Sequence, residues 1–250
     1  MKKSFFFIFL ILLLILIPSS VFAATANPYA QALNVNKIMA SPQFGSSIQM
    51  ILGISMISLV PFFLISITSF LRIIVVLSLV RTSIGTQQVP PSSVLVSLAI
   101  FMTIFVMAPV WNEVNQNAVT PYSQGKISEM KAVEIGLKPI RNFMVRQVRE
   151  KDLELFVGFA KIAPPKTVDE VPTQVLIPAF MISELKTAFQ IGFLLFVPFL
   201  IVDLVVSNIL LSLGMFMLSP VMVSLPFKIL LFVLVDGWNL ICKGLLLSFR

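Results

Sequence analysis

Four apolar segments, arranged as two pairs, dominate this chain and restrict the folds open to it. They cover residues 48–80, 92–110, 175–218 and 227–247, and none carries more than three charged side chains. An apolar segment of about 20 residues can cross the hydrocarbon core of a bilayer as a helix. A short turn joins the members of each pair. The sequence therefore predicts an all-α membrane protein built from two long helical hairpins.

The composition supports a membrane protein and excludes several kinds of site. Of the 250 residues, 58% are hydrophobic and 12% are charged, whereas soluble domains contain about 25% charged residues. The absence of His and the single Cys242 exclude His-ligated metals, His general bases and internal disulfides, so we expect no metal and no cofactor. The net charge of +7 forms no basic stripe, so we expect no nucleic-acid partner.

The N-terminus has the pattern of a secretory signal peptide. Lys2 and Lys3 precede an uncharged apolar run over residues 5–17, and small residues allow cleavage after Ala23 or, as an alternative, Ala26. An uncleaved membrane helix is the other interpretation, but the run is short for one. We therefore predict a signal peptide over residues 1–23 and an extracytoplasmic segment over residues 24–47.

The first arm of each predicted hairpin is too long for a simple membrane crossing. As one helix, residues 48–80 would span about 50 Å, against a hydrocarbon core of about 30 Å. Pro61 predicts a kink in this helix, and Arg72 interrupts its apolar run. The first hairpin is assigned to residues 48–112 and the second to residues 175–250.

A charged segment, residues 113–174, separates the hairpins. Ile140, Phe143, Met144 and Val148 recur at helical spacing, with charged residues largely off that stripe. The segment therefore predicts amphipathic helices, and the predicted topology places them on the extracytoplasmic side. That topology puts Arg81 inside, as the positive-inside rule favours, although Lys243 and Arg250 fit it poorly.

Several charged residues lie within or beside the apolar segments, where each would cost at least about 2.5–3.5 kcal/mol at membrane depth. They are Arg72, Glu184, Lys186, Asp203, Lys228 and Asp236. Glu184 and Lys186 are two residues apart, so they point to different faces of a helix and need separate partners. Arg72 and Asp203 could pair across the hairpins or between subunits. A proton relay is the alternative to such structural pairing.

The turn of the second hairpin, residues 213–220, contains Met215, Phe216 and Met217. Irregular backbone at membrane depth has to face protein or a cavity. A ring of such apolar side chains could close a pore by excluding water. The plainer interpretation is that Met is simply frequent in an apolar chain, since twelve are present.

A series of short motifs occurs in order between residues 48 and 238. They are residues 61–72 and 77–81, the turn of Gly85, Thr86, Gln87, Gln88, Pro90 and Pro91, and residues 107–109, 139–144, 152–153, 177–180, 183–189, 214–215, 225–228 and 235–238. Together they resemble the flagellar biosynthetic protein FliP family, the core export-gate component of type III secretion systems.

The resemblance implies an assembly that composition does not reveal. It implies a homopentamer that joins FliQ-type and FliR-type subunits, and other export-apparatus membrane subunits, in a helical oligomeric channel. This complex would lie in the flagellar basal body at the bacterial inner membrane, largely on the periplasmic side within the membrane ring. Its hairpins would then pack on protein as well as on lipid, which accounts for the long arms and the charges.

The same resemblance implies a function without enzymatic activity. The family's methionine-rich pore gate corresponds to Met215, Phe216 and Met217, with Phe216 departing from a run of three Met. The substrates would be unfolded flagellar proteins, and partners would supply the energy, because the chain has no phosphate-binding loop.

Two other classes of function remain open from the residues alone. A proton-coupled small-solute transporter of the inner membrane predicts that the charged residues line a cavity in one monomer. A membrane hydrolase has little support, because the chain lacks His and metal motifs. The channel instead predicts charges at subunit interfaces and one axial pore.

Overall fold

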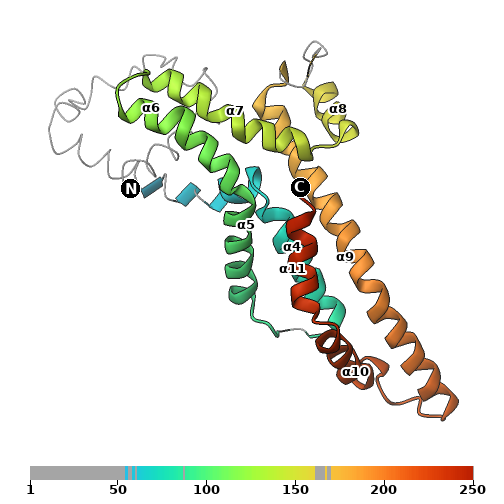
Figure 1. The fold of residues 1–250 in the computed structure, drawn as a ribbon. Helices are drawn as coiled ribbons and strands as arrows, with labels where there is room; N and C mark the ends of the chain where they lie inside the picture. The colour runs from blue at the N-terminus through green and yellow to red at the C-terminus, as the bar shows by residue number, and fades with distance from the viewer. Residues whose placement is uncertain are drawn as a thin grey trace, which may run out of the picture. The chain divides into compact units, whose positions relative to one another are not determined.

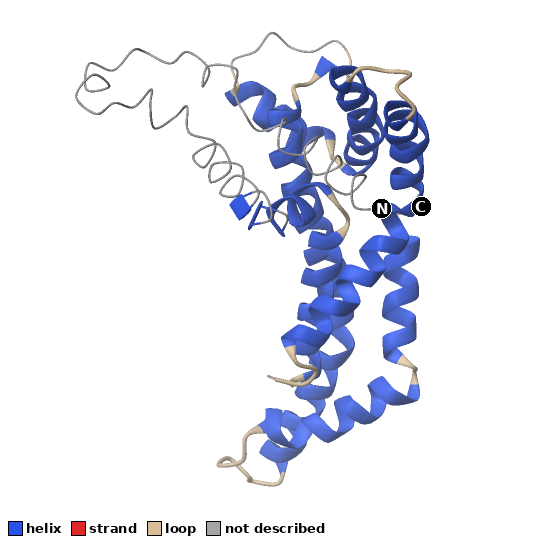
Figure 2. Ribbon diagram, turned by 90° about the vertical axis from the view of Figure 1, so that its left-hand side faces the viewer, coloured by secondary structure: helices blue, strands red, loops and turns tan. Residues whose placement is uncertain are grey.

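The structure is a computed structural model that describes residues 54–55, 58–59, 61–86, 88–160, 167 and 170–249. Helices and loops make up this part of the chain, and Figure 2 shows no strand in it. The prediction of an all-α fold is therefore confirmed for the described residues. The predicted signal peptide and the segment 24–47 lie outside them.

The chain divides into two compact units, one of residues 1–64 and 114–138 and the other of residues 65–113 and 139–250. The first unit holds the π-helix η3 (Asn115–Val119), α6 (Thr120–Ser123) and the start of α7 (Glu129–Gln147). Figure 1 labels the helices of the second unit, which are α4 (Phe70–Ile84), nearly all of α5 (Ser92–Val114), the end of α7, α8 (Glu150–Phe159), α9 (Thr173–Ser212), α10 (Pro220–Leu234) and α11 (Gly237–Leu247).

Helices α4 and α9 pack along each other and form the core of the second unit. Each helix buries a stripe of residues three and four apart, which is the pattern of a helix with one inward face. The stripes contain Ile73, Val76, Leu77 and Val80 on α4 and Leu176, Ala179, Phe180 and Ala188 on α9. At Gly192 the helices approach so closely that an added Cβ would lie 2.3 Å from Cδ1 of Leu79.

The prediction that the first apolar segment forms one long helix is wrong. The kink predicted at Pro61 borders Val60, which lies outside the described residues, so it stays a prediction. A short helix, Pro61–Ile67, ends before Thr68, and α4 begins at Phe70 after a bend of 88°. Thr68 Oγ1 accepts the backbone N–H of Phe70 at 3.3 Å. Such local hydrogen bonds from Ser and Thr side chains compete with the helix, and they account for a break here that the apolar pattern does not reveal.

The second apolar segment forms a longer helix than predicted. Its helix does not end at Val110 but continues as a 32-residue helical run to Ser123, with the π-helical turn η3 within it. Residues 110–120 contain no Gly and no Pro that would stop the helix. The change from apolar to polar residues therefore does not mark the end of the helix.

Two helices of the described chain are long and apolar enough to cross a membrane, Ser92–Ser123 and Thr173–Ser212. Two bent pairs, residues 61–84 and 220–247, would raise the number to four if each pair counted as one crossing. Helix α9 has 40 residues, so it is about 60 Å long, twice the thickness of a hydrocarbon core.

The charged segment contains the amphipathic helices that its periodicity predicts. Within α7, Ile140, Phe143 and Met144 are buried. The Arg141 guanidinium donates to the carbonyl of Val171 at 2.7 Å and to Thr173 Oγ1 at 2.5 Å, which ties α7 to the start of α9. Helix α8 packs against α9 as well. Helix α7 thus buries an apolar face and is tied to α9 by polar contacts, whereas no residue of α8 is fully buried.

Replacing Gly192 with Ala is expected to destabilise the protein by about 1–3 kcal/mol, because the new methyl group would overlap Leu79. The measurement is the apparent midpoint of thermal unfolding of the purified protein in detergent. Gly158→Ala and Gly244→Ala are matched controls, since a Cβ at either helical position meets nothing within 4 Å. An unchanged midpoint for Gly192→Ala would show that α4 and α9 do not approach as described.

Candidate functional site

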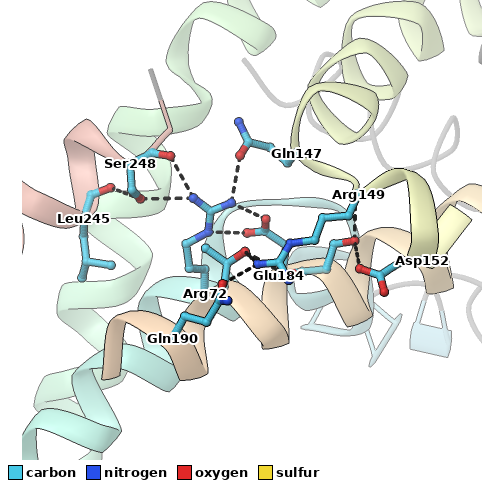
Figure 3. A network of polar contacts seen from close by, with 10 residues as sticks. Arg72, Gln147, Arg149, Asp152, Glu184, Gln190, Leu245 and Ser248 are labelled. Atoms are coloured by element: carbon cyan, nitrogen blue, oxygen red, sulfur yellow. Dashed lines mark hydrogen bonds and ion pairs between the residues drawn. The ribbon is translucent and has the colours of Figure 1, made fainter. Parts of the chain in front are cut away.

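A buried arginine joins four helices of the second unit. Arg72 of α4 donates from Nε to Glu184 Oε2 at 2.9 Å and from Nη2 to Glu184 Oε1. Nη2 also donates to Gln147 Oε1 at 2.8 Å, and Nη1 donates to the carbonyl and the hydroxyl of Ser248 at 2.9 and 3.1 Å. Figure 3 shows these contacts converging on the guanidinium. All five N–H donors of Arg72 are thereby paired.

The pairing offsets the cost of burying two charges. The side chains of Arg72 and Glu184 are 2% and 0% exposed. Desolvation of an ion pair is offset only when its geometry is good and the remaining polar atoms are bonded. The ring of Phe249 completes the site, with its centroid 3.9 Å from Cζ of Arg72. Because the partners belong to α4, α7, α9 and the end of α11, the pair fixes these helices to one another.

The residues beside Glu184 fasten the corner between α7 and α8 to α9. Ser183 Oγ donates to Asp152 Oδ2 at 2.6 Å and accepts the backbone N–H of Arg149 at 3.0 Å. The Arg149 guanidinium donates to Thr187 Oγ1 at 3.1 Å and to Gln190 Oε1 at 2.6 Å, and Figure 3 draws the labelled members of this group. One stretch of α9 thus holds α4 with one face and the α7–α8 corner with another.

A second ion pair lies farther along α9. Lys228 Nζ of α10 contacts Asp203 Oδ2 at 2.6 Å, and Ser224 Oγ donates to Asp203 Oδ1 at 2.5 Å. Lys228 is 4% exposed at its side chain, whereas Asp203 is 25% exposed. This pair holds α10 against α9.

The structure corrects the predicted pairing of charges. Arg72 does not pair with Asp203 within the chain, because each has a nearer partner on the helix packed against it, Glu184 and Lys228 respectively. The prediction that Glu184 and Lys186 point to different faces is confirmed, since Glu184 is buried and Lys186 is exposed. Asp236 is exposed too. Burial of Lys186 and Asp236 at a subunit interface stays a prediction.

The motif that begins at Gly85 forms the turn between α4 and α5. Gly85 adopts φ 91°, a conformation that favours Gly, and its N–H donates to the carbonyl of Thr82 at 3.0 Å. The Arg81 guanidinium donates across the turn to the Pro90 carbonyl at 3.3 Å and to Ser92 Oγ at 3.0 Å.

The other residues of this turn motif lie between Gly85 and the start of α5. Thr86 Oγ1 donates to the carbonyl of Arg81 at 3.2 Å, and the Pro91 carbonyl accepts the backbone N–H groups of Val94 and Leu95 in the first turn of α5. Gln88 is exposed, and Gln87 lies outside the described residues. A Cβ on Gly85 would lie 3.4 Å from Leu225 on α10, so the turn of the first hairpin rests against the second.

The loop between α9 and α10 presents apolar side chains from a defined backbone. Gly214 has φ 73°, its N–H donates to the Leu211 carbonyl, and the N–H of Met215 donates to the Leu210 carbonyl. This is the Schellman arrangement that ends a helix at a left-handed Gly. Pro220 then starts α10, a favoured first position for Pro.

The side chains of that loop point away from the rest of the chain. Met215, Phe216, Met217 and Leu218 are 44%, 76%, 100% and 46% exposed. Exposure of four large apolar side chains in a row is unfavourable in water, so this loop is suited to contact with other apolar groups. We call residues 215–218 the apolar loop.

Sequence reasoning does not find all of the polar network. Gln147, Arg149, Ser248 and Phe249 contact Arg72, Ser183 or Thr187, yet no local pattern distinguishes them from other residues of their types. Only the tertiary fold brings them to α9. Among the described residues no group of three or more His, Cys, Asp and Glu could hold a metal ion.

Glu184→Gln is expected to destabilise the protein by about 3–5 kcal/mol, because it leaves the Arg72 charge buried without a counter-charge. Lys186→Gln is the matched control, because Lys186 lies two residues away on the same helix and is exposed. This substitution is expected to change the free energy of unfolding by no more than about 0.5 kcal/mol. Thermal unfolding in detergent measures both. Equal effects of the two substitutions would contradict a buried ion pair.

Comparison with known proteins identifies close relatives. The model of the FliP family matches residues 53–245. A protein of Bacillus subtilis named "Flagellar biosynthetic protein FliP" is 53% identical over 204 residues, covering 82% of this chain and 92% of its own. Proteins of the same name from Pectobacterium carotovorum and Aquifex aeolicus are 51% and 48% identical, covering 81% and 82% of this chain and 79% and 86% of theirs.

Proposed function

The chain belongs to the FliP family, and we propose that it is the core channel subunit of a flagellar type III protein export gate. In this proposal it forms the pore through which unfolded flagellar proteins leave the cytoplasm. Family membership supports a role in flagellar biosynthesis, after which its relatives are named. The observation that carries the pore is the apolar loop, with Met217 fully exposed.

The chemistry of the apolar loop suits a gate. An apolar constriction excludes water and ions while it is closed, because wetting it is unfavourable. Unbranched Met side chains are flexible, so a ring of them can seal and then yield to a passing polypeptide. The rigid ring of Phe216 adds apolar area but adapts less. We propose that Met215 and Met217 give the gate its compliance and that Phe216 adds to the seal.

The exposed apolar surface of α9 supports assembly with other subunits. Phe189, Phe193 and Leu194 are 58%, 69% and 70% exposed in the single chain. Contiguous apolar surface of this kind marks contact with protein or lipid. We propose a homopentamer that joins FliQ-type and FliR-type subunits at the inner membrane, in the flagellar basal body and largely on its periplasmic side.

The Arg72 site disfavours a proton-coupled transporter. A relay carboxylate has to exchange protons with water or with a neighbouring relay group. Both oxygens of Glu184 are instead bonded to Arg72, and the side chain is 0% exposed. We therefore propose a structural role for this pair and a non-enzymatic role for the chain, with partners supplying the energy.

Replacing both Met215 and Met217 with Ala is expected to make the membrane leaky, because smaller side chains leave water in the closed constriction. The assay is potassium efflux from cells that express the gate subunits together. Met130→Ala is the matched control, because Met130 is 84% exposed but lies on α7, far from the loop in sequence. Unchanged efflux in the double variant would count against the gate.

The oligomeric state separates the channel from the transporter. The purified chain, co-expressed with FliQ-type and FliR-type subunits, is expected to run on a native gel as a complex with five copies of this chain. Native mass measurement gives the copy number directly. A monomer or dimer that takes up a small solute would support the transporter instead.

A further inference from the structure

The segment that follows α11 is part of the buried Arg72 site. Ser248 comes directly after the helix, and its carbonyl and hydroxyl oxygens accept both N–H groups of Arg72 Nη1 at 2.9 and 3.1 Å. The Ser248 hydroxyl donates in turn to the carbonyl of Leu245 at 2.8 Å. The contact spans 176 positions of sequence and brings Ser248 to the first turn of α4.

The ring of Phe249 closes the site from another side. It lies 3.9 Å from the guanidinium carbon of Arg72, within the range of a cation–π contact. The same ring stacks on Phe143 of α7, with centroids 6.3 Å apart and an interplanar angle of 25°. Phe249 is thus held between a buried cation and an aromatic side chain.

Without these two residues the guanidinium is incompletely paired. Glu184 and Gln147 satisfy three of the five N–H donors, and Ser248 satisfies the other two. With Ser248 and Phe249 in place, the side chain of Arg72 is 2% exposed, so these residues help to exclude water from it. The carbonyls at the C-terminus of a helix also carry partial negative charge, which favours a cation there. Arg72 therefore binds the end of α11 by charge as well as by hydrogen bonds.

We propose that Ser248 and Phe249 form a latch that positions Arg72 and locks α11 onto α4 and α9. Both residues are synthesised after every other member of the site, so the Arg72 site is complete only once translation has passed α11. Because α11 follows α10 directly, the latch also anchors the arm that carries the apolar loop. The latch positions Arg72 and takes no part in chemistry. Its contacts are seen in the structure, whereas its effect on the gate rests on the proposed function.

The test of the latch compares a substitution that removes the aromatic ring of Phe249 with one that keeps it. Phe249→Leu keeps an apolar side chain but loses the ring, and it is expected to lower the thermal midpoint of the purified protein in detergent by about 2–4 °C. Phe249→Tyr keeps the ring and is expected to restore the midpoint. Equal losses for Leu and Tyr, or no loss for Leu, would overturn the cation–ring contact.

A double-mutant cycle separates the contact with Arg72 from the stacking on Phe143. The background is Arg72→Gln with Glu184→Gln, which removes both charges together and leaves no lone buried ion. In that background Phe249→Leu is expected to lower the midpoint by less than half as much as in the native chain. A full, additive loss would show that Phe249 acts through Phe143 alone and would overturn the latch.

Hydrogen–deuterium exchange gives a second readout that does not depend on a thermal transition. In the native protein, the backbone N–H of Ser248, which donates to the carbonyls of Gly244 and Leu245, is expected to exchange slowly. In the Arg72→Gln, Glu184→Gln variant its exchange is expected to be at least tenfold faster. Equally fast exchange in the native protein would overturn the proposal.

A comparison of ion leakage keeps the latch and the gate distinguishable. Potassium efflux is measured for Phe249→Leu beside the variant with Met215→Ala and Met217→Ala. If the loop variant leaks and Phe249→Leu does not, the gate stands and its coupling to the latch is overturned. If neither leaks while the exchange pattern holds, the latch stands and the proposed pore function fails.

Discussion

The need to pair every donor of a buried guanidinium organises the second unit of this protein. The side chain of Arg72 is 2% exposed, and each of its N–H groups left unpaired would cost at least about 1–3 kcal/mol. The five acceptors come from Glu184, Gln147 and Ser248, which lie on or beside three different helices. Since α4 lies in the core along α9, the ends of α7 and α11 have to meet there. The positions of four helices are thus coupled to one side chain.

The residues around Glu184 show how a short stretch of α9 contacts several neighbouring helices. Ser183 faces the α7–α8 corner, Glu184 faces Arg72 and Thr187 meets Arg149, while Lys186 remains exposed. Farther along the helix, Asp203 holds Lys228 and so fixes α10. The polar residues of α9 therefore act as a series of attachment points. Many of its other apolar residues, such as Phe193 and Leu194, are exposed, and we propose that they contact other subunits.

Helix type and the separation of Glu184 from Lys186 could be predicted, because both follow from local spacing. The bend at Thr68–Ser69 could not, because side-chain hydrogen bonding breaks a run that is apolar enough to continue. The helix through residues 110–120 escapes prediction for another reason, since polar residues interrupt the apolar pattern without ending the helix. Of the candidate site, the apolar loop is evident from its residue types. The partners of Arg72 are not, because Gln147, Glu184 and Ser248 are 75, 112 and 176 positions away.

The sequence alone determined the helical fold of the described residues, the membrane-length apolar segments and the absence of His, and its ordered motifs were sufficient to recognise the family. These properties depend on composition and on spacing within a single helix. The tertiary structure decided which charges pair, where the first segment bends, and that the residues after α11 complete a site on α4. The reason is physical: an ion pair forms between groups that the fold brings within about 3 Å, and sequence distance places no limit on which groups those are.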